Sequence, residues 1–178
     1  MGWTIFTEEL EALLSAPPDL PAGLSVVDIR LDAGWMARLS GIGIGSEDSV
    51  VPLYGVCPIP SHRGITIAAR HGPAVIGQAS FSFCRQGGGI APQLDGVAVD
   101  PAFRGQGVGG QLAAAMAIII LETARRGMVR APDLPDMIDS AIGGDFNAGG
   151  EAVALRLGRL IEDGLAVLEE SCVAPGMP

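Results

Sequence analysis

The sequence contains no lysine, so all eleven of its Lys and Arg side chains are arginines. A Walker-type phosphate-binding loop needs a lysine after its last glycine, which excludes that class of protein. The three cysteines, Cys57, Cys84 and Cys172, are odd in number and widely spaced. This pattern argues against a disulfide framework and against a zinc site, and it favours a reducing cytoplasm. We therefore expect no bound metal.

Basic charge and long apolar runs are also scarce. The formal net charge is −9, whereas nucleic-acid surfaces consist of clustered Lys and Arg, so we expect no nucleic-acid partner. The longest unbroken apolar run, Leu112–Leu121, has about half the length of a membrane span and suits a buried helix. Residues 1–15 carry no Lys or Arg, so we expect no signal peptide, no membrane partner and a cytoplasmic location.

Aromatic residues make up only 4% of the chain, so the expected core consists of Val, Ile, Leu and Ala. Apolar residues still account for 48%, which excludes general disorder, and 178 residues suit one folded domain. We divide the chain into an N-terminal helical extension over residues 1–23 and a single domain over residues 24–178.

Hydrophobic periodicity predicts a mixed α/β fold in the broad sense. Because the sheet is expected to be mostly antiparallel and flanked by helices, the fold belongs to the α+β class. The first part of the chain is expected to form a helix, a strand and a further helix over Thr7–Ser15, Leu24–Arg30 and Ala33–Ser40. Three antiparallel strands and a helix follow over Ile65–Arg70, Ala74–Cys84, Ile90–Val99 and 108–126.

The C-terminal half has a less regular pattern. A further strand could lie only at Met128–Arg130, because Pro132 follows. Residues 131–150 are expected to be an insertion with one or two helical turns. A helix is predicted over Glu151–Asp163 and a last strand over Leu165–Glu170.

The segment Val97–Gly110 carries the strongest functional signal. A β-branched strand ends at Pro101, and an arginine and four glycines follow before an apolar helix. Glycines at such a turn let backbone N–H groups face outward without obstruction by a Cβ atom. The positive dipole end of the helix lies at the same place, so the segment predicts a phosphate-binding cradle.

These glycines allow two other interpretations. Gly105, Gly107 and Gly110 satisfy the dinucleotide pattern Gly-x-Gly-x-x-Gly. In that fold the first glycine closes the strand almost directly, whereas here Asp100 to Arg104 intervene. The motif also lies mid-chain, after a strand-rich half. A plain glycine-rich turn between strand and helix is the remaining alternative.

The string Arg104-Gly-Gln-Gly-Val-Gly109 matches the signature (Gln/Arg)-x-x-Gly-x-(Gly/Ala) of the GNAT acyl-CoA N-acyltransferases. It follows a strand ending in Val-x-Val-x-Pro, and the chain resembles this family across about residues 64–126. The resemblance implies a GNAT-like mixed, mostly antiparallel twisted sheet. It also implies acetyl-CoA as cofactor and transfer of an acetyl group to a primary amine of a small molecule or peptide.

The resemblance further implies which residues bind the cofactor. The strand would offer backbone N–H groups, from Val97 and Val99 above all, to the pantetheine and the acetyl carbonyl. The loop would hold the pyrophosphate, and Arg104 would either contact phosphate or brace the loop. The full set of expected cofactor-binding residues is Val97, Ala98, Val99, Arg104, Gly105, Gln106, Gly107, Val108, Gly109 and Gly110.

Proton transfer needs a base for the ammonium and an acid for the leaving thiolate. Asp95 is the candidate base, because period-two geometry puts it on the same strand face as Val97 and Val99. His62 and His71 are rivals. Many family members use a tyrosine on the C-terminal helix as the acid, but the matching segment here contains none. Tyr54, the only tyrosine, is therefore the candidate acid, with water as the alternative.

Two other functional classes remain open. One is a weak or silent acyl-CoA-binding module, because the usual tyrosine is missing. The other is a nucleotide-binding oxidoreductase domain. We also expect a homodimer: helix 108–126 is apolar almost all round, and the fold expects two closing strands where the chain offers one. A second copy could cover the helix and complete the sheet.

Overall fold

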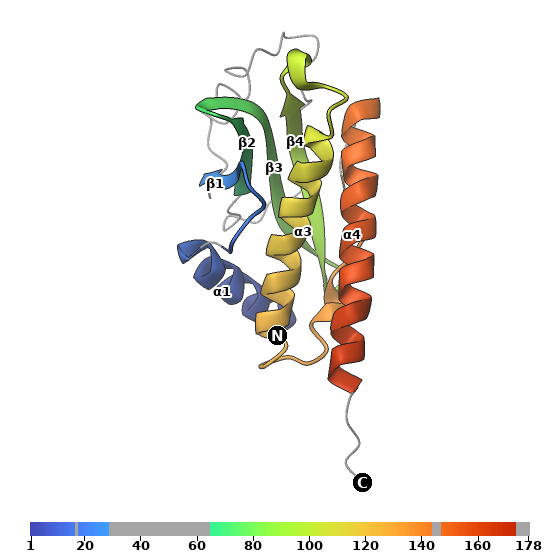
Figure 1. Cartoon of the computed structure of the whole chain (residues 1–178). Helices are drawn as coiled ribbons and strands as arrows, with labels where there is room; N and C mark the ends of the chain where they lie inside the picture. Colours follow the sequence, from blue (N-terminus) through green and yellow to red (C-terminus); the bar gives the residue numbers. More distant parts are fainter. Residues whose placement is uncertain (17, 29–64, 144–146, 174–178) are drawn as a thin grey trace.

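The computed structural model describes residues 1–16, 18–28, 65–143 and 147–173 of the chain. A four-stranded antiparallel sheet in the order β1-β2-β3-β4 forms its centre (Figure 1). The strands are β1 (Leu24–Asp28), β2 (Ile65–His71), β3 (Ala74–Gln86) and β4 (Gly89–Val99). The predicted mixed fold and the antiparallel series in the middle of the chain are therefore confirmed.

Three long helices of the described residues lie on one side of the sheet, with α3 between the other two (Figure 1). They are α1 (Gly2–Ser15), α3 (Val108–Gly127) and α4 (Ala148–Val173), and two short 3-10 turns are η1 (Pro101–Phe103) and η2 (Pro135–Met137). Phe6 of α1 is fully buried, so this helix shares the core of the sheet. An ion pair of 2.7 Å between Arg130 and Glu8 also holds α1 to the chain after α3.

The sheet has two different faces, because side chains alternate along each strand. In β3, Phe81 and Phe83 point toward the helices and belong to the hydrophobic core. The Phe83 ring lies edge-on to Phe6, with centroids 5.0 Å apart. The alternate residues point to the opposite side and are also buried. We call that side the polar face and define it by Thr66, Gln78, Ser80 and Ser82.

Glycines allow α3 and α4 to pack closely. A Cβ atom on Gly109 would lie 2.9 Å from a methyl group of Val153, and one on Gly164 would overlap the Leu121 side chain. Real Cβ atoms do not approach neighbours this closely, so larger residues at either place would push the helices apart. The pairing of α3 with α4 therefore depends on these small residues.

Met128–Arg130, the only place that the sequence left for a fifth strand, does not form one. These residues form turns after α3, in which Met128 and Arg130 donate backbone hydrogen bonds to Ala124 and Gly127. Two isolated parallel bridges instead join Ile138 and Gly143 to β4. The segment beside β4 thus comes about ten residues later than predicted and pairs only briefly.

The last strand predicted at Leu165–Glu170 is also wrong, and the helix predicted over Glu151–Asp163 is too short. The structure has a single helix, α4, from Ala148 to Val173. Leu157, Ile161 and Leu165 are buried at helical spacing, so the apolar face continues past Gly164. Gly164 packs against α3 and does not end the helix.

The apolar circumference of α3 does not require a second copy of the chain to cover it. The sheet, α1 and α4 together cover the apolar circumference of α3, and most of the helix is buried. By length and composition alone α3 could cross a membrane, but here it is the core helix of the fold. The dimer itself is untested and stays a prediction.

Several sequence-based expectations lie outside the described residues. These are the end of the strand Leu24–Arg30 beyond Asp28, the helix Ala33–Ser40, and the candidates Tyr54 and His62.

Candidate functional site

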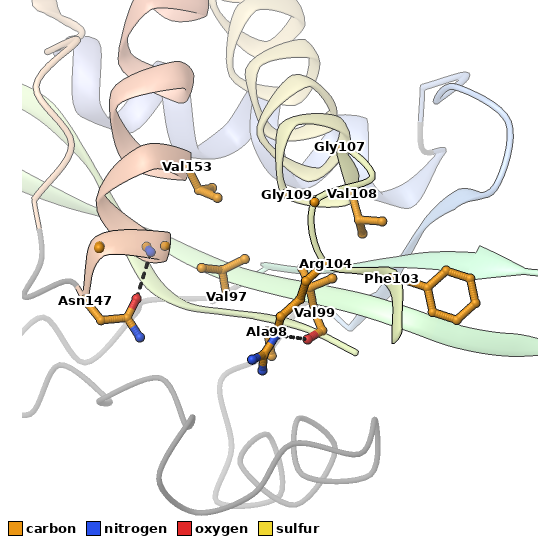
Figure 2. A pocket seen from close by; sticks show the side chains of 14 residues that line it. Val97, Ala98, Val99, Phe103, Arg104, Gly107, Val108, Gly109, Asn147 and Val153 are labelled. Carbon is orange, nitrogen blue, oxygen red and sulfur yellow. Dashed lines mark hydrogen bonds between the residues drawn. The ribbon is translucent and has the colours of Figure 1, made fainter. Parts of the chain in front are cut away.

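A pocket of about 490 Å³ opens between the end of β4, the glycine loop and the start of α4 (Figure 2). Eight of the ten residues expected to bind a cofactor line it: Val97, Ala98, Val99, Arg104, Gly105, Gly107, Val108 and Gly109. The structure therefore brings the strand and the loop of the motif together around one cavity. The remaining lining residues are Phe103, Val153 and the four residues Asn147–Gly150.

The loop of the pocket depends on left-handed backbone conformations. Gly105 and Gly107 have φ angles of 75° and 84°, a region that residues with a Cβ atom rarely adopt. Gly107 is the N-cap of α3 and has no side chain that could accept a hydrogen bond from the first turn. The first N–H groups of α3 and the positive end of its dipole therefore lie at this loop, as an anion site requires.

Arg104 braces the loop against the strand. Its Nε atom donates a hydrogen bond of 3.1 Å to the carbonyl oxygen of Val99 (Figure 2). Asp100 stabilises the intervening turn by accepting a hydrogen bond of 2.9 Å from the Ala102 amide. Of the two roles left open for Arg104, the bracing role is the one that the geometry supports directly.

Gln106 and Gly110 do not line the pocket. The side-chain amide of Gln106 donates to the carbonyl oxygen of Ala102 at 3.0 Å, so it folds back on the loop. A Cβ atom on Gly110 would lie 3.2 Å from Nε of Arg156, which places Gly110 against α4. These two residues shape the loop and the helix packing around the site.

A second helix, α4, begins at the same pocket, and its first residues and cap were not predicted from the sequence. Asn147 Oδ1 accepts a hydrogen bond of 2.9 Å from the Gly150 amide and so caps α4 (Figure 2). The prediction began this helix at Glu151. An asparagine a few residues before an apolar helical repeat, here Asn147 before Ala-Gly-Gly-Glu, is a recognisable N-cap signal and could have identified these residues.

The edge of β4 that faces away from β3 is open beside the pocket. The Asp100 amide donates to Ile76 of β3 at 2.9 Å, whereas the Val99 carbonyl accepts from Arg104 on the other side. Alternate residues direct their N–H groups to opposite edges. The amides of Val97 and Val99 therefore face away from β3. Past Leu94, whose amide donates to Gly143, no described segment pairs with this edge.

Asp95 does not lie on the strand face that was predicted. Leu94 pairs with Phe81 and Gly96 with Ser80, so Asp95 is the extra residue of a β-bulge. The bulge changes the alternation, and the Asp95 side chain lies on the polar face with Ser82. Val97 pairs with Ala79 of the core and lines the pocket instead. The expected common face for Asp95 and Val97 is therefore wrong.

The carboxyl group of Asp95 is buried and only half satisfied. Its Oδ1 atom accepts a hydrogen bond of 3.0 Å from Ser82 Oγ, and Oδ2 is buried with no hydrogen-bond partner. Burial raises the pKa of Asp95 from its ordinary 3.8 to about 7, against a smaller lowering by the Ser82 hydrogen bond. The group therefore changes protonation state near neutral pH.

His71 lies near the pocket without entering it. It is exposed at the end of β2, and its ring centroid is 5.6 Å from that of Phe103, which lines the cavity. Of the other two candidate bases, Asp95 is buried in the sheet and His62 lies outside the described residues.

Comparison with known families fits this geometry. Residues 45–130 match the model of the acetyltransferase (GNAT) family. This part of the chain is a GNAT-family domain. The matched segment includes β2, β3, β4, the glycine loop and α3, whereas α4 with its cap at Asn147 lies beyond it. No curated protein matches the chain. The family match supports acyltransferase activity in general.

Proposed function

We propose that this protein transfers an acetyl group from acetyl-CoA to a primary amine of a small molecule or peptide. The observation that carries the proposal is the pocket in which the GNAT glycine loop, the open edge of β4 and two helix N-termini meet. We keep the cytoplasm as its proposed location and expect neither nucleic acid nor membrane as a partner.

The residues of the pocket fit an acyl-CoA. The N-termini of α3 and α4 offer backbone N–H groups and positive dipole ends to the pyrophosphate, and Gly105 and Gly107 keep the loop free of side chains. Val97, Val99 and Val153 give the cavity the apolar wall that a pantetheine chain would contact. Acetyl-CoA supplies the acetyl group, already activated as a thioester.

The amides of Val97 and Val99 would serve as fixed donors. β3 is paired with the other edge of β4, so the direction of these two N–H groups is fixed before a ligand binds. A donor aimed at the oxygen that gains negative charge can contribute about 3–4 kcal/mol to transition-state stabilisation. The side chains of the same residues remain ordinary wall residues of the pocket.

Asp95 would act as the base. A carboxyl group with a pKa of about 7 can take a proton from an ammonium group and still be half ionised at neutral pH. Overall, a C–N bond forms and the thioester C–S bond breaks. Of the two protons that the ammonium loses, one goes to the carboxylate and the other to the sulfur. Tyr54 stays the proposed acid for that second proton.

A catalytically silent acyl-CoA-binding module is the second candidate. The described part of α4 contains no tyrosine that could act as the acid. Leu155, which is exposed, and Leu157, which is buried, lie in this part of the helix, and neither side chain can donate a proton. A nucleotide-binding oxidoreductase is not supported, because its fold needs parallel strands and all four strands here are antiparallel.

The test is free-thiol release from acetyl-CoA in the presence of a panel of primary amines, run beside calorimetric titration with CoA. Tight CoA binding with amine-dependent thiol release supports the transferase. CoA binding without release for any amine favours the silent module. Absence of CoA binding contradicts both.

A further inference from the structure

Two buried side-chain oxygens of the described residues have no hydrogen-bond partner. They are Oε1 of Gln78 and Oδ2 of Asp95. Gln78 is only 6% exposed. Most buried polar groups in folded proteins are paired, so an unpaired one calls for an explanation. Here both unpaired atoms are hydrogen-bond acceptors.

The two acceptors lie on the same face of the sheet, one on each side of a single cross-strand pair. Gln78 of β3 is opposite Ala98 of β4, and the next pair on this face is Ser80 with Gly96. Asp95 directly precedes Gly96 as the bulge residue. Gln78 and Asp95 therefore flank one cross-strand pair, and its β4 member, Gly96, has no side chain.

Neighbouring polar groups on this face are satisfied locally. The hydroxyl groups of Thr66 and Ser80 share a hydrogen bond of 2.7 Å, and Ser82 donates to the other oxygen of Asp95. These buried side chains therefore find hydrogen-bond partners within the sheet. Gln78 Oε1 and the outer oxygen of an ionised Asp95 differ from them, because neither oxygen has a hydrogen-bond donor.

We propose that Gln78 and Asp95 form the acceptor site, in which Gln78 Oε1 and Asp95 Oδ2 accept hydrogen bonds from the primary amine that becomes acetylated. This inference rests on the proposed function. A primary ammonium group has three N–H donors and a positive charge, which suits a carboxylate and an amide oxygen together. A hydroxyl has one donor and a tertiary ammonium has one, so neither can satisfy both oxygens.

The position of the site agrees with the reaction. Gln78 and Asp95 lie beside Gly96 and Ala98 on the polar face, whereas the pocket meets Val97 and Val99 at the open edge of the same strand. The amine site and the pocket are therefore separated by only a few residues of β4. Gln78 binds the nitrogen and sets selectivity for primary amines, and Asp95 both binds it and takes the proton.

The first experiment compares Gln78→Met with the wild-type protein, using the panel amine that gives the fastest thiol release. The substitution keeps similar length and removes the acceptor. We expect the KM for the amine to rise about 10-fold to 100-fold, the loss of one hydrogen bond to a charged group. The KM for acetyl-CoA and the affinity for CoA should stay the same. The melting temperature should not fall, because an unpaired buried acceptor has been removed.

The matched control is Thr66→Val, which changes a polar residue of the same face that already has a partner. It should lower stability and leave the KM for the amine unchanged. An unchanged amine KM in Gln78→Met, or equal rises in both variants, would overturn the acceptor site. If the wild-type protein neither binds CoA nor releases thiol, the proposed function fails instead, and the two failures are thereby distinguished.

A second measurement needs no variant and no turnover. Thermal shift of the wild-type protein with n-butylammonium, N,N-dimethylbutylammonium and n-butanol compares ligands of one chain length. The site predicts stabilisation by the primary ammonium, with a clearly smaller shift for the other two. Equal shifts for the primary and tertiary ammonium ions would contradict it.

Discussion

Ser82 and Asp95 are joined across β3 and β4 by a hydrogen bond of 3.0 Å, which leaves the outer carboxyl oxygen buried and unpartnered. Ser82 orients the carboxyl group and, by hydrogen bonding to its charged form, lowers the pKa that burial raises. This pair links the fold to the proposed chemistry, because the bulge that puts Asp95 on the polar face also puts it beside Ser82.

Asp95→Asn should lower kcat/KM for the amine by about 10²- to 10⁴-fold, the usual contribution of a positioned base. The wild-type rate should fall below pH 7, where Asp95 is protonated, and the variant should lose that limb of the profile. Ser82→Ala should move the limb to higher pH, because a hydrogen bond to the charged form is lost. A pH profile unchanged in Asp95→Asn would exclude Asp95 as the base.

The same carboxyl group predicts how stability depends on pH. Its pKa is about 7 in the folded protein and ordinarily 3.8, so unfolding releases a proton between these values. Its contribution is fully present below pH 3.8 and is lost as the pH rises through 7. The slope is at most about 1.4 kcal/mol per pH unit. Urea unfolding from pH 4 to 8 should show this decline in the wild-type protein and a flatter curve in Asp95→Asn.

The homodimer is predicted to give twice the monomer mass of 18.2 kDa in light scattering at micromolar concentration. The cover of α3 within the chain removes one of the two reasons for it, and the open edge of β4 past Leu94 is the other. Leu155 and Val167, two exposed apolar residues of α4, form one surface that a second copy would bury. A monomer mass at all concentrations tested would refute the dimer.

The sequence was most informative where local rules decide the structure. Alternating apolar residues predicted β2, β3 and β4 within a few residues, and the glycines predicted the tight loop before α3, because positive φ angles there favour glycine. The bulge at Asp95 was not predictable, since periodicity counts residues and cannot register one that the partner strand skips.

The C-terminal half depended on contacts between distant residues. Gly164 looks like a helix stop, but its missing side chain makes room for Leu121 of α3, and the helix continues. The segment Ile138–Gly143 follows β4 through only two bridges, and its Asp, Ser and Gly residues give no strand pattern. Both outcomes are set by packing partners that no local window contains.

The central claim is that the glycine loop and the N-termini of α3 and α4 bind an acyl-CoA. Calorimetric titration with CoA, in the wild-type protein and in Gly107→Glu and Gly107→Ala, tests it most directly. The left-handed φ of 84° makes any side chain there cost about 1–2 kcal/mol of stability, so the alanine variant controls for backbone strain. The account predicts that CoA binds the wild-type protein, that NAD does not, and that glutamate abolishes binding in a folded variant while alanine weakens it less. Unchanged CoA affinity in folded Gly107→Glu would contradict the account.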